Sequence, residues 1–244
     1  MVEAFLWGAF AASSLLLGAA IAIARTPHRR MLGMVMGFGA GVLLSAVSFE
    51  LIAKAIAASG GLEAAMAGFF VGAGVFGAGD ALIARSGYAH RKDISGAPPD
   101  ATGMAIVLGA LLDGIPESAV LGLTLVATGE IGAAMLVAVF VSNVPEGIAA
   151  TASLRSGGWS TRGLLALWGS MALAAGVAAA LGFAMLDGAS PEALAFVLAF
   201  AAGAILAMLS TSMMPEAYEH AGRVVGIVTT FGFALALVVN WLEA

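Results

Sequence analysis

The chain is dominated by long apolar stretches that are separated by short charged or Gly/Pro-rich turns. Each stretch has roughly 20 residues, the length that an α-helix needs to cross a bilayer core. The pattern predicts eight membrane-spanning helices, at residues 4–24, 31–53, 64–84, 102–126, 131–153, 162–186, 192–214 and 224–242. A transmembrane barrel is excluded, because its strands alternate apolar and polar residues.

The composition excludes a soluble fold. Of the 244 residues, 61% are hydrophobic and only 10% are charged, whereas a soluble domain carries about 25% charged residues. We therefore predict an all-α, polytopic helical bundle in the lipid bilayer, with residues 1–244 forming one transmembrane domain. The first apolar run carries Glu3 where a signal peptide is positively charged, so we expect it to be a span. The net charge of −5 argues against a nucleic-acid partner, and the absence of Cys excludes thiolate metal sites.

The Lys and Arg residues predict the orientation in the membrane. Basic residues near span ends are retained in the cytoplasm. Nine of the ten Lys and Arg residues follow odd-numbered spans, and Lys54 alone lies on the other side. This bias predicts that both termini are outside the cell membrane and that the cytoplasmic loops are residues 25–30, 86–101, 155–162 and 216–223.

Three carboxylates lie deep in the predicted spans. Span four contains Asp113-Gly-Ile-Pro-Glu117, and span five contains Ser142-Asn-Val-Pro-Glu146. A charge at the bilayer centre costs roughly 2.5–3.5 kcal/mol on the mildest scale, and neither span has a deep Lys or Arg to neutralise it. A spacing of four residues places Asp113 with Glu117, and Ser142 with Glu146, on one helix face. Four oxygen-bearing side chains are therefore expected to converge.

A proline precedes each of the two glutamates. Pro116 and Pro145 cannot donate a hydrogen bond to the carbonyl four residues earlier, which frees that carbonyl oxygen inside the membrane. The repeated Pro-Glu, at positions 117 and 146, suggests two halves of one cation site. Two other readings stay open: protonated acids that hydrogen-bond within the bundle, and an intramembrane hydrolase with an aspartyl-type dyad. The neighbouring amide and hydroxyl groups suit coordination better than hydrolysis, so we expect no enzyme.

These residues resemble the Zrt/Irt-like (ZIP) divalent-metal transporters, whose fourth and fifth helices carry His-Asn-x-Pro-Glu-Gly-type motifs around a binuclear metal site. Residues 72–80 are similar to the family's third helix. The family's second helix is similar to Gly37-Phe-Gly-Ala-Gly-Val-Leu-Leu44. Its seventh helix is similar to Phe200-Ala-Ala-Gly-Ala204 followed by Met214-Pro-Glu-Ala217. The resemblance implies an inverted-repeat bundle, often a homodimer, with an elevator-like movement. It also implies that a divalent metal ion, zinc, manganese or iron, is the transported substrate and that there is no prosthetic group.

The resemblance also implies the metal ligands. Glu117 and Glu146 match the family's bridging glutamates, Asp113 stands at its first His, and Ser142 and Asn143 stand at the polar pair of helix five. Two departures remove ligands from the second metal position: Gly114 replaces an Asn, and Leu173-Ala174 replaces a Glu-Pro pair. We therefore expect one metal position, with the ligands Asp113, Glu117, Ser142, Asn143 and Glu146. The alternative is a degenerate relative that binds or senses a cation without transporting it.

The other ionisable residues are weaker candidates. Glu50 lies four residues before Lys54, which favours a salt bridge over a role in metal entry. Asp80 could assist ion release or form a helix-packing hydrogen bond. Three histidines fall on the predicted cytoplasmic side, where solvated loop positions are favoured over a metal relay: His28, His90 and His220.

Glycines recur at small-residue spacing in spans two and three. Such spacing lets two membrane helices approach closely. The sequence therefore predicts helix-packing surfaces at Gly33, Gly37, Gly41, Gly68 and Gly72.

Overall fold

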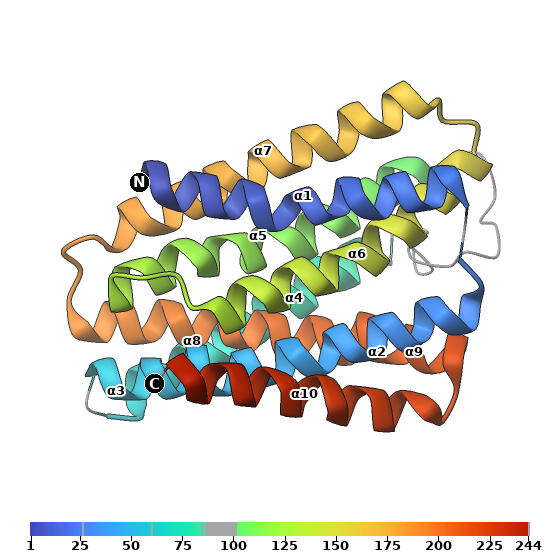
Figure 1. The fold of residues 1–244 in the computed structure, drawn as a ribbon. Helices are drawn as coiled ribbons and strands as arrows, with labels where there is room; N and C mark the ends of the chain where they lie inside the picture. The colour runs from blue at the N-terminus through green and yellow to red at the C-terminus, as the bar shows by residue number, and fades with distance from the viewer. Residues whose placement is uncertain (26, 60, 84, 86–101, 244) are drawn as a thin grey trace.

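The computed structural model describes residues 1–25, 27–59, 61–83, 85 and 102–243. The regular secondary structure of these residues is entirely helical (Figure 1). Eight helical segments of the described residues are long and apolar enough to cross a membrane. The predicted all-α fold is confirmed, and the chain is an integral, multi-pass membrane protein.

Two of the eight spans are composite, and each contains a π-helical turn. The π-helices η1 and η3 interrupt spans two and seven, which run over Arg29–Ser59 and Pro191–Ala221. Both spans are longer than predicted, because Lys54 and the Pro215-Glu216 pair lie within the continuing helix instead of ending it. The six simple spans are α1 (Val2–Ala24), α4 (Glu63–Ile83), α5 (Thr102–Thr128), α6 (Ala133–Ser156), α7 (Thr161–Leu186) and α10 (Val224–Glu243). The composite spans consist of α2 (Arg29–Ala46), η1 (Val47–Ile52) and α3 (Ala53–Ser59), and of α8 (Pro191–Met208), η3 (Leu209–Met213) and α9 (Met214–Ala221).

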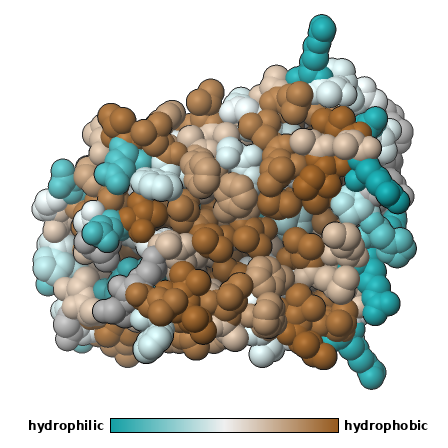
Figure 2. All heavy atoms as spheres, viewed as in Figure 1, coloured by the Kyte–Doolittle hydropathy of each residue, from teal (hydrophilic) through white to brown (hydrophobic). Residues whose placement is uncertain are grey.

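The chain termini and the connections after α1, α6 and α9 lie at opposite ends of the bundle (Figure 1). On the face that Figure 2 shows, hydrophilic residues gather towards these two ends and hydrophobic residues cover the region between them. This distribution suits a bundle whose middle lies in hydrocarbon. The predicted cytoplasmic loop at 86–101, with His90, lies outside the described residues.

The two composite spans repeat one motif in opposite directions (Figure 1). Phe38-Gly-Ala-Gly-Val-Leu-Leu44 in α2 corresponds to Phe200-Ala-Ala-Gly-Ala-Ile-Leu206 in α8. The glycine that both copies share, Gly41 in α2 and Gly203 in α8, packs against the backbone of another helix. A Cβ added at Gly41 would collide with the Thr229 carbonyl oxygen of α10, and one added at Gly203 would collide with the Phe69 carbonyl oxygen of α4. The copies therefore make equivalent contacts.

The remaining helix contacts follow the same symmetry. α2 packs along α10 and α8 packs along α4, while α1 packs on α6 and α7 packs on α5. The same set of contacts results when α1 is exchanged with α7, α2 with α8, α4 with α10, and α5 with α6. The arrangement is the inverted repeat that the resemblance implies, with α5 and α6 as the central pair.

The glycines predicted from their spacing do mediate close packing. Those of α2 face α9 and α10, and those of α4 face Phe196 and Phe200 of α8. A Cβ would lie 2.8 Å or less from backbone atoms of the neighbouring helix at Gly33, Gly41, Gly68 and Gly72, and 3.0 Å from a Val225 methyl group at Gly37. The glycines therefore permit the close separation of these helices. The confirmed positions are Gly33, Gly37, Gly41, Gly68 and Gly72.

Candidate metal centre

The three predicted carboxylates are buried in the middle of the central helices. Asp113 is 0% exposed, Glu117 is 1% exposed and Glu146 is 5% exposed. Asp113 and Glu117 lie on α5, and Glu146 lies on α6 beside the buried Ser142 and Asn143. The five predicted ligands are therefore held away from the bundle surface on two adjacent helices.

Both proline-containing helices continue past their prolines. Pro116 is inside α5 and Pro145 is inside α6, one residue before Glu117 and Glu146. Because proline has no N–H, it leaves the carbonyl four residues earlier without its helical donor. Each glutamate therefore follows a turn in which the helix lacks one backbone hydrogen bond.

The Ser142 hydroxyl is oriented by the backbone. It donates a hydrogen bond of 3.0 Å to the carbonyl oxygen of Val139. A hydroxyl that donates its proton in this way keeps its oxygen lone pairs for another partner. Helix α2 approaches the same turn, since a Cβ added at Gly39 would lie 3.2 Å from the Ser142 Cα and 3.2 Å from the Met213 Cε.

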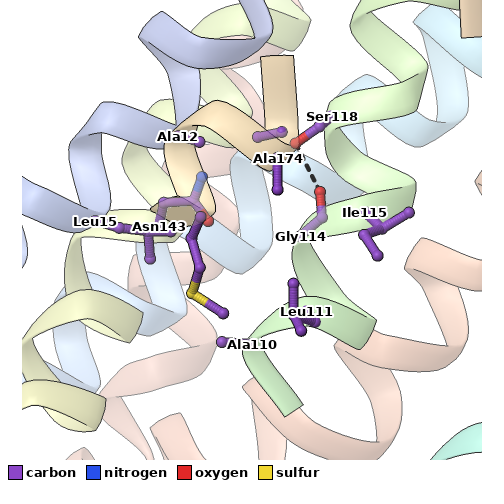
Figure 3. Close-up of a pocket in the computed structure, with 11 residues that line it drawn as sticks. Ala12, Leu15, Ala110, Leu111, Gly114, Ile115, Ser118, Asn143 and Ala174 are labelled. Atoms are coloured by element: carbon purple, nitrogen blue, oxygen red, sulfur yellow. Dashed lines mark hydrogen bonds between the residues drawn. The ribbon is translucent and has the colours of Figure 1, made fainter. Parts of the chain in front are cut away.

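A small pocket lies between α1, α5 and α7, and Asn143 of α6 also lines it (Figure 3). Asn143 lies on one side, and Gly114 and Ser118 lie on the other, with the Ser118 hydroxyl donating to the Gly114 carbonyl at 2.7 Å. Its volume of about 20 Å³ is enough for one water molecule. The two positions that depart from the ZIP pattern, Gly114 and Ala174, both line it. The cavity therefore lies beside two positions where the resemblance leads us to expect metal ligands.

The carboxylates do not form a complete metal cage by themselves. Among the residues that the structure describes, no group of three or more His, Cys, Asp or Glu side chains is arranged to hold a metal ion. An ion bound between α5 and α6 would therefore need other oxygen donors as well. The buried side chains of Ser142 and Asn143 on α6 are candidates, and water is a further source of oxygen.

Helix α6 is held closely against α1. A Cβ added at Gly18 would lie 2.4 Å from the Val144 carbonyl oxygen, and one added at Gly147 would lie 2.6 Å from the Leu15 carbonyl oxygen. At the C-terminal end of α6, Arg155 Nη1 donates to the carbonyl oxygen of Ile23 at 2.8 Å. A cation at the C-terminus of α1 also opposes the negative end of its helix dipole.

A buried hydrogen bond joins α6 to α7. Trp168 Nε1 donates to Thr151 Oγ1 at 2.8 Å, and both residues are 0% exposed. Sequence reasoning missed this bond. A tryptophan and a threonine in two apolar spans look like ordinary membrane residues, and only their contact reveals the pair.

The predicted salt bridge between Glu50 and Lys54 is confirmed. Glu50 is buried and accepts hydrogen bonds from Lys54 Nζ and from Asn240 Nδ2 of α10. Of the histidines, His28 caps α2 by accepting from the Arg30 N–H at 3.3 Å, and His220 packs beside Gly33. Asp80 is half-buried near the end of α4, where its predicted role in ion release stays untested.

Comparison with known proteins gives one informative relative. No protein-family model matches the chain. A protein of Arabidopsis thaliana named "Putative zinc transporter" is 30% identical to it over 193 residues, which cover 78% of this chain. The matched region spans 30% of the length of that relative. The match supports the resemblance to the Zrt/Irt-like transporters.

Proposed function

We propose that this chain carries a divalent metal cation across the membrane through an oxygen-lined site between α5 and α6. The observation that carries the proposal is the burial of Asp113, Glu117 and Glu146 at the middle of two adjacent membrane helices. Each ionised carboxylate at that depth costs roughly 2.5–3.5 kcal/mol. A divalent cation bound between the helices offsets this cost, and this compensation explains how ionised carboxylates are tolerated at that depth.

The donor chemistry favours a hard or borderline metal ion. The proposed ligands are Asp113, Glu117, Ser142, Asn143 and Glu146, with Asn143 binding through its amide oxygen. All five supply oxygen, and carboxylate, carbonyl and water oxygens suit ions such as manganese, whereas imidazole suits zinc. The relative's name points to zinc. Zinc, manganese and iron are therefore the substrates to compare.

Uptake into proteoliposomes tests this proposal. Purified protein is reconstituted and exposed to zinc, manganese and ferrous iron, with Glu117→Gln and Glu146→Gln as the test variants. Each change keeps the side-chain size and removes the charge, so uptake is expected to collapse in both while the protein still folds. Glu63→Gln, at an exposed acid in the first turn of α4, is the matched control. Uptake at the wild-type rate in either site variant would refute the assignment.

A second candidate function is cation binding or sensing without transport. It is favoured by the cavity at Gly114 and Ala174, where the ZIP pattern has metal ligands. Metal binding that depends on Glu117 but gives no flux in the same proteoliposomes would support this alternative. Flux that depends on Glu117 would exclude it.

The proposed membrane context is a plasma membrane with both termini outside. It follows from the basic loops and is tested by the labelling experiment in the Discussion. The resemblance further suggests a homodimer of a single transmembrane domain, residues 1–244. The mass of the detergent-solubilised protein, measured by light scattering, distinguishes a dimer from a monomer.

A further inference from the structure

The outer end of α6 lies beside a buried charged cluster that the metal site does not use. Glu50 is in the π-helix η1 and is only 1% exposed. Its carboxylate accepts hydrogen bonds from Lys54 Nζ on α3 and from Asn240 Nδ2 on α10. The Lys54 side chain is 30% exposed and the Glu50 side chain is 2% exposed. Three helical segments thus meet at one carboxylate.

The same carboxylate touches the residue that begins α6. Gly132 is the N-cap of α6 and has no side chain of its own to cap that helix. A Cβ added at Gly132 would lie 2.7 Å from Glu50 Oε2 and 3.3 Å from Oε1. Both carboxylate oxygens therefore occupy the space that a side chain at 132 would need. A helix N-terminus carries a partial positive charge, so a carboxylate placed there stabilises it.

We propose that Glu50, Lys54, Asn240 and Gly132 form an outer clamp that fixes the first turns of α6 against η1 and α10. Glu50 is a positioning residue in this arrangement and does not bind the metal. Arg155 already fixes the C-terminal end of α6 to α1, so the clamp fixes the opposite end. The effect on the ligands of α6 rests on the proposed metal site, whereas the clamp itself does not.

Hydrogen exchange, followed by mass spectrometry, tests the clamp independently of transport. The measured amides are those of residues 136–140, which begin where the Leu136 N–H donates to the Gly132 carbonyl oxygen at 3.0 Å. Glu50→Gln removes the charge, and Gly132→Ala pushes the carboxylate away. Both are expected to speed exchange there by about tenfold, the effect of losing a favourable charge at a helix end. The exchange rates of the amides in the first turns of α7 and α8 should not change.

Glu192→Gln is the matched control, because Glu192 is an exposed acid in the first turn of α8. Unchanged exchange at 136–140 in both clamp variants would overturn the proposal. Equal acceleration in all helices would overturn it as well, since that result means general destabilisation. If Glu50→Gln does not fold, Asn240→Leu removes one donor at nearly constant volume and is judged by the same criterion.

Metal binding tests the positioning role. Competition with a fluorescent zinc indicator is expected to give about fivefold weaker binding in Gly132→Ala and Glu50→Gln than in Glu192→Gln, because the ligands shift without being removed. Wild-type affinity in both variants would overturn the positioning role. If the wild-type protein binds no metal, the proposed function fails, and the exchange experiment still decides the clamp.

Discussion

The contact between α1 and α6 gives a prediction whose size follows from the structure. At Gly18, an added Cβ would lie 2.4 Å from the Val144 carbonyl oxygen, 2.9 Å from the Ile148 nitrogen and 3.0 Å from the Gly147 Cα. All three neighbours are backbone atoms, so no side-chain rotation relieves the collision. Gly18→Ala therefore has to move one helix relative to the other.

The movement reaches the proposed metal ligands. Real Cβ atoms essentially never lie within 3.0 Å of such a neighbour, so the Val144 oxygen must retreat from 2.4 Å to at least that distance. Overpacking of this kind costs about 1–3 kcal/mol of stability. Val144 lies between Asn143 and Glu146, and a displacement of 1 Å at a reacting group can cost about a hundredfold. For this smaller shift we expect roughly tenfold weaker metal binding.

Thermal unfolding of the purified protein and indicator competition measure the two effects. The control is Gly169→Ala in α7, where an added Cβ meets nothing within 4 Å. Because alanine favours a helix over glycine, the control is expected to leave stability unchanged or to raise it by about 0.5–1 kcal/mol. If Gly18→Ala matched Gly169→Ala in both melting temperature and metal affinity, the α1–α6 contact would not position the site.

Three further predictions concern the bundle, its orientation and its selectivity. Trp168→Phe removes the donor to the buried Thr151 hydroxyl and should lower the free energy of unfolding by about 1–3 kcal/mol; an effect that persists undiminished in a Thr151→Val background would contradict this cause. Since the chain has no native Cys, an impermeant maleimide on intact cells should label Asp187→Cys and not Thr161→Cys, and the opposite pattern would reverse the topology. Asp113→His should raise the ratio of zinc affinity to manganese affinity, because imidazole suits zinc; an unchanged or lower ratio in competition binding would show that residue 113 does not tune the ion.

The sequence predicted the spans well because hydropathy is a local property. Each apolar run reports its own burial in lipid, whatever it packs against. The ends of spans two and seven were wrong for the same reason. The prediction ended span two before Lys54 and span seven before Pro215-Glu216, but both helices continue beyond a π-helical turn into α3 and α9. Where a polar helix end emerges from the membrane, polarity alone does not mark its last residue.

The inverted repeat left a signal that could have been found in the sequence. Phe38-Gly-Ala-Gly-Val-Leu-Leu44 and Phe200-Ala-Ala-Gly-Ala-Ile-Leu206 match in pattern across the two halves. The match is short and built from common membrane residues, so it gains weight only when both copies carry a π-helix at the same distance from the start of the span. The symmetry was predicted here only through the family resemblance.

For the metal site and the contacts around it, the sequence predicted the local features but not the contacts between distant residues. Deep acids beside prolines can be recognised within one span, and their burial agrees with the prediction. The contacts of Glu50 with Asn240 and with Gly132 join residues far apart in sequence, and no local pattern predicts them. Sequence reasoning found the pair Glu50 and Lys54 because its members are one helical turn apart.

The glycines around α6 connect packing to function. Gly18 admits the backbone of α6 against α1, Gly39 admits it against α2, and Gly132 admits the Glu50 carboxylate at its N-terminus. At Gly18 a side chain would move α6 relative to α1, at Gly39 it would crowd α6, and at Gly132 it would displace the Glu50 carboxylate. Glycines with open space, such as Gly74, have no such neighbour. These close approaches, which small residues permit in membranes, therefore hold the helix that carries the proposed ligands Ser142, Asn143 and Glu146 against α1 and α2.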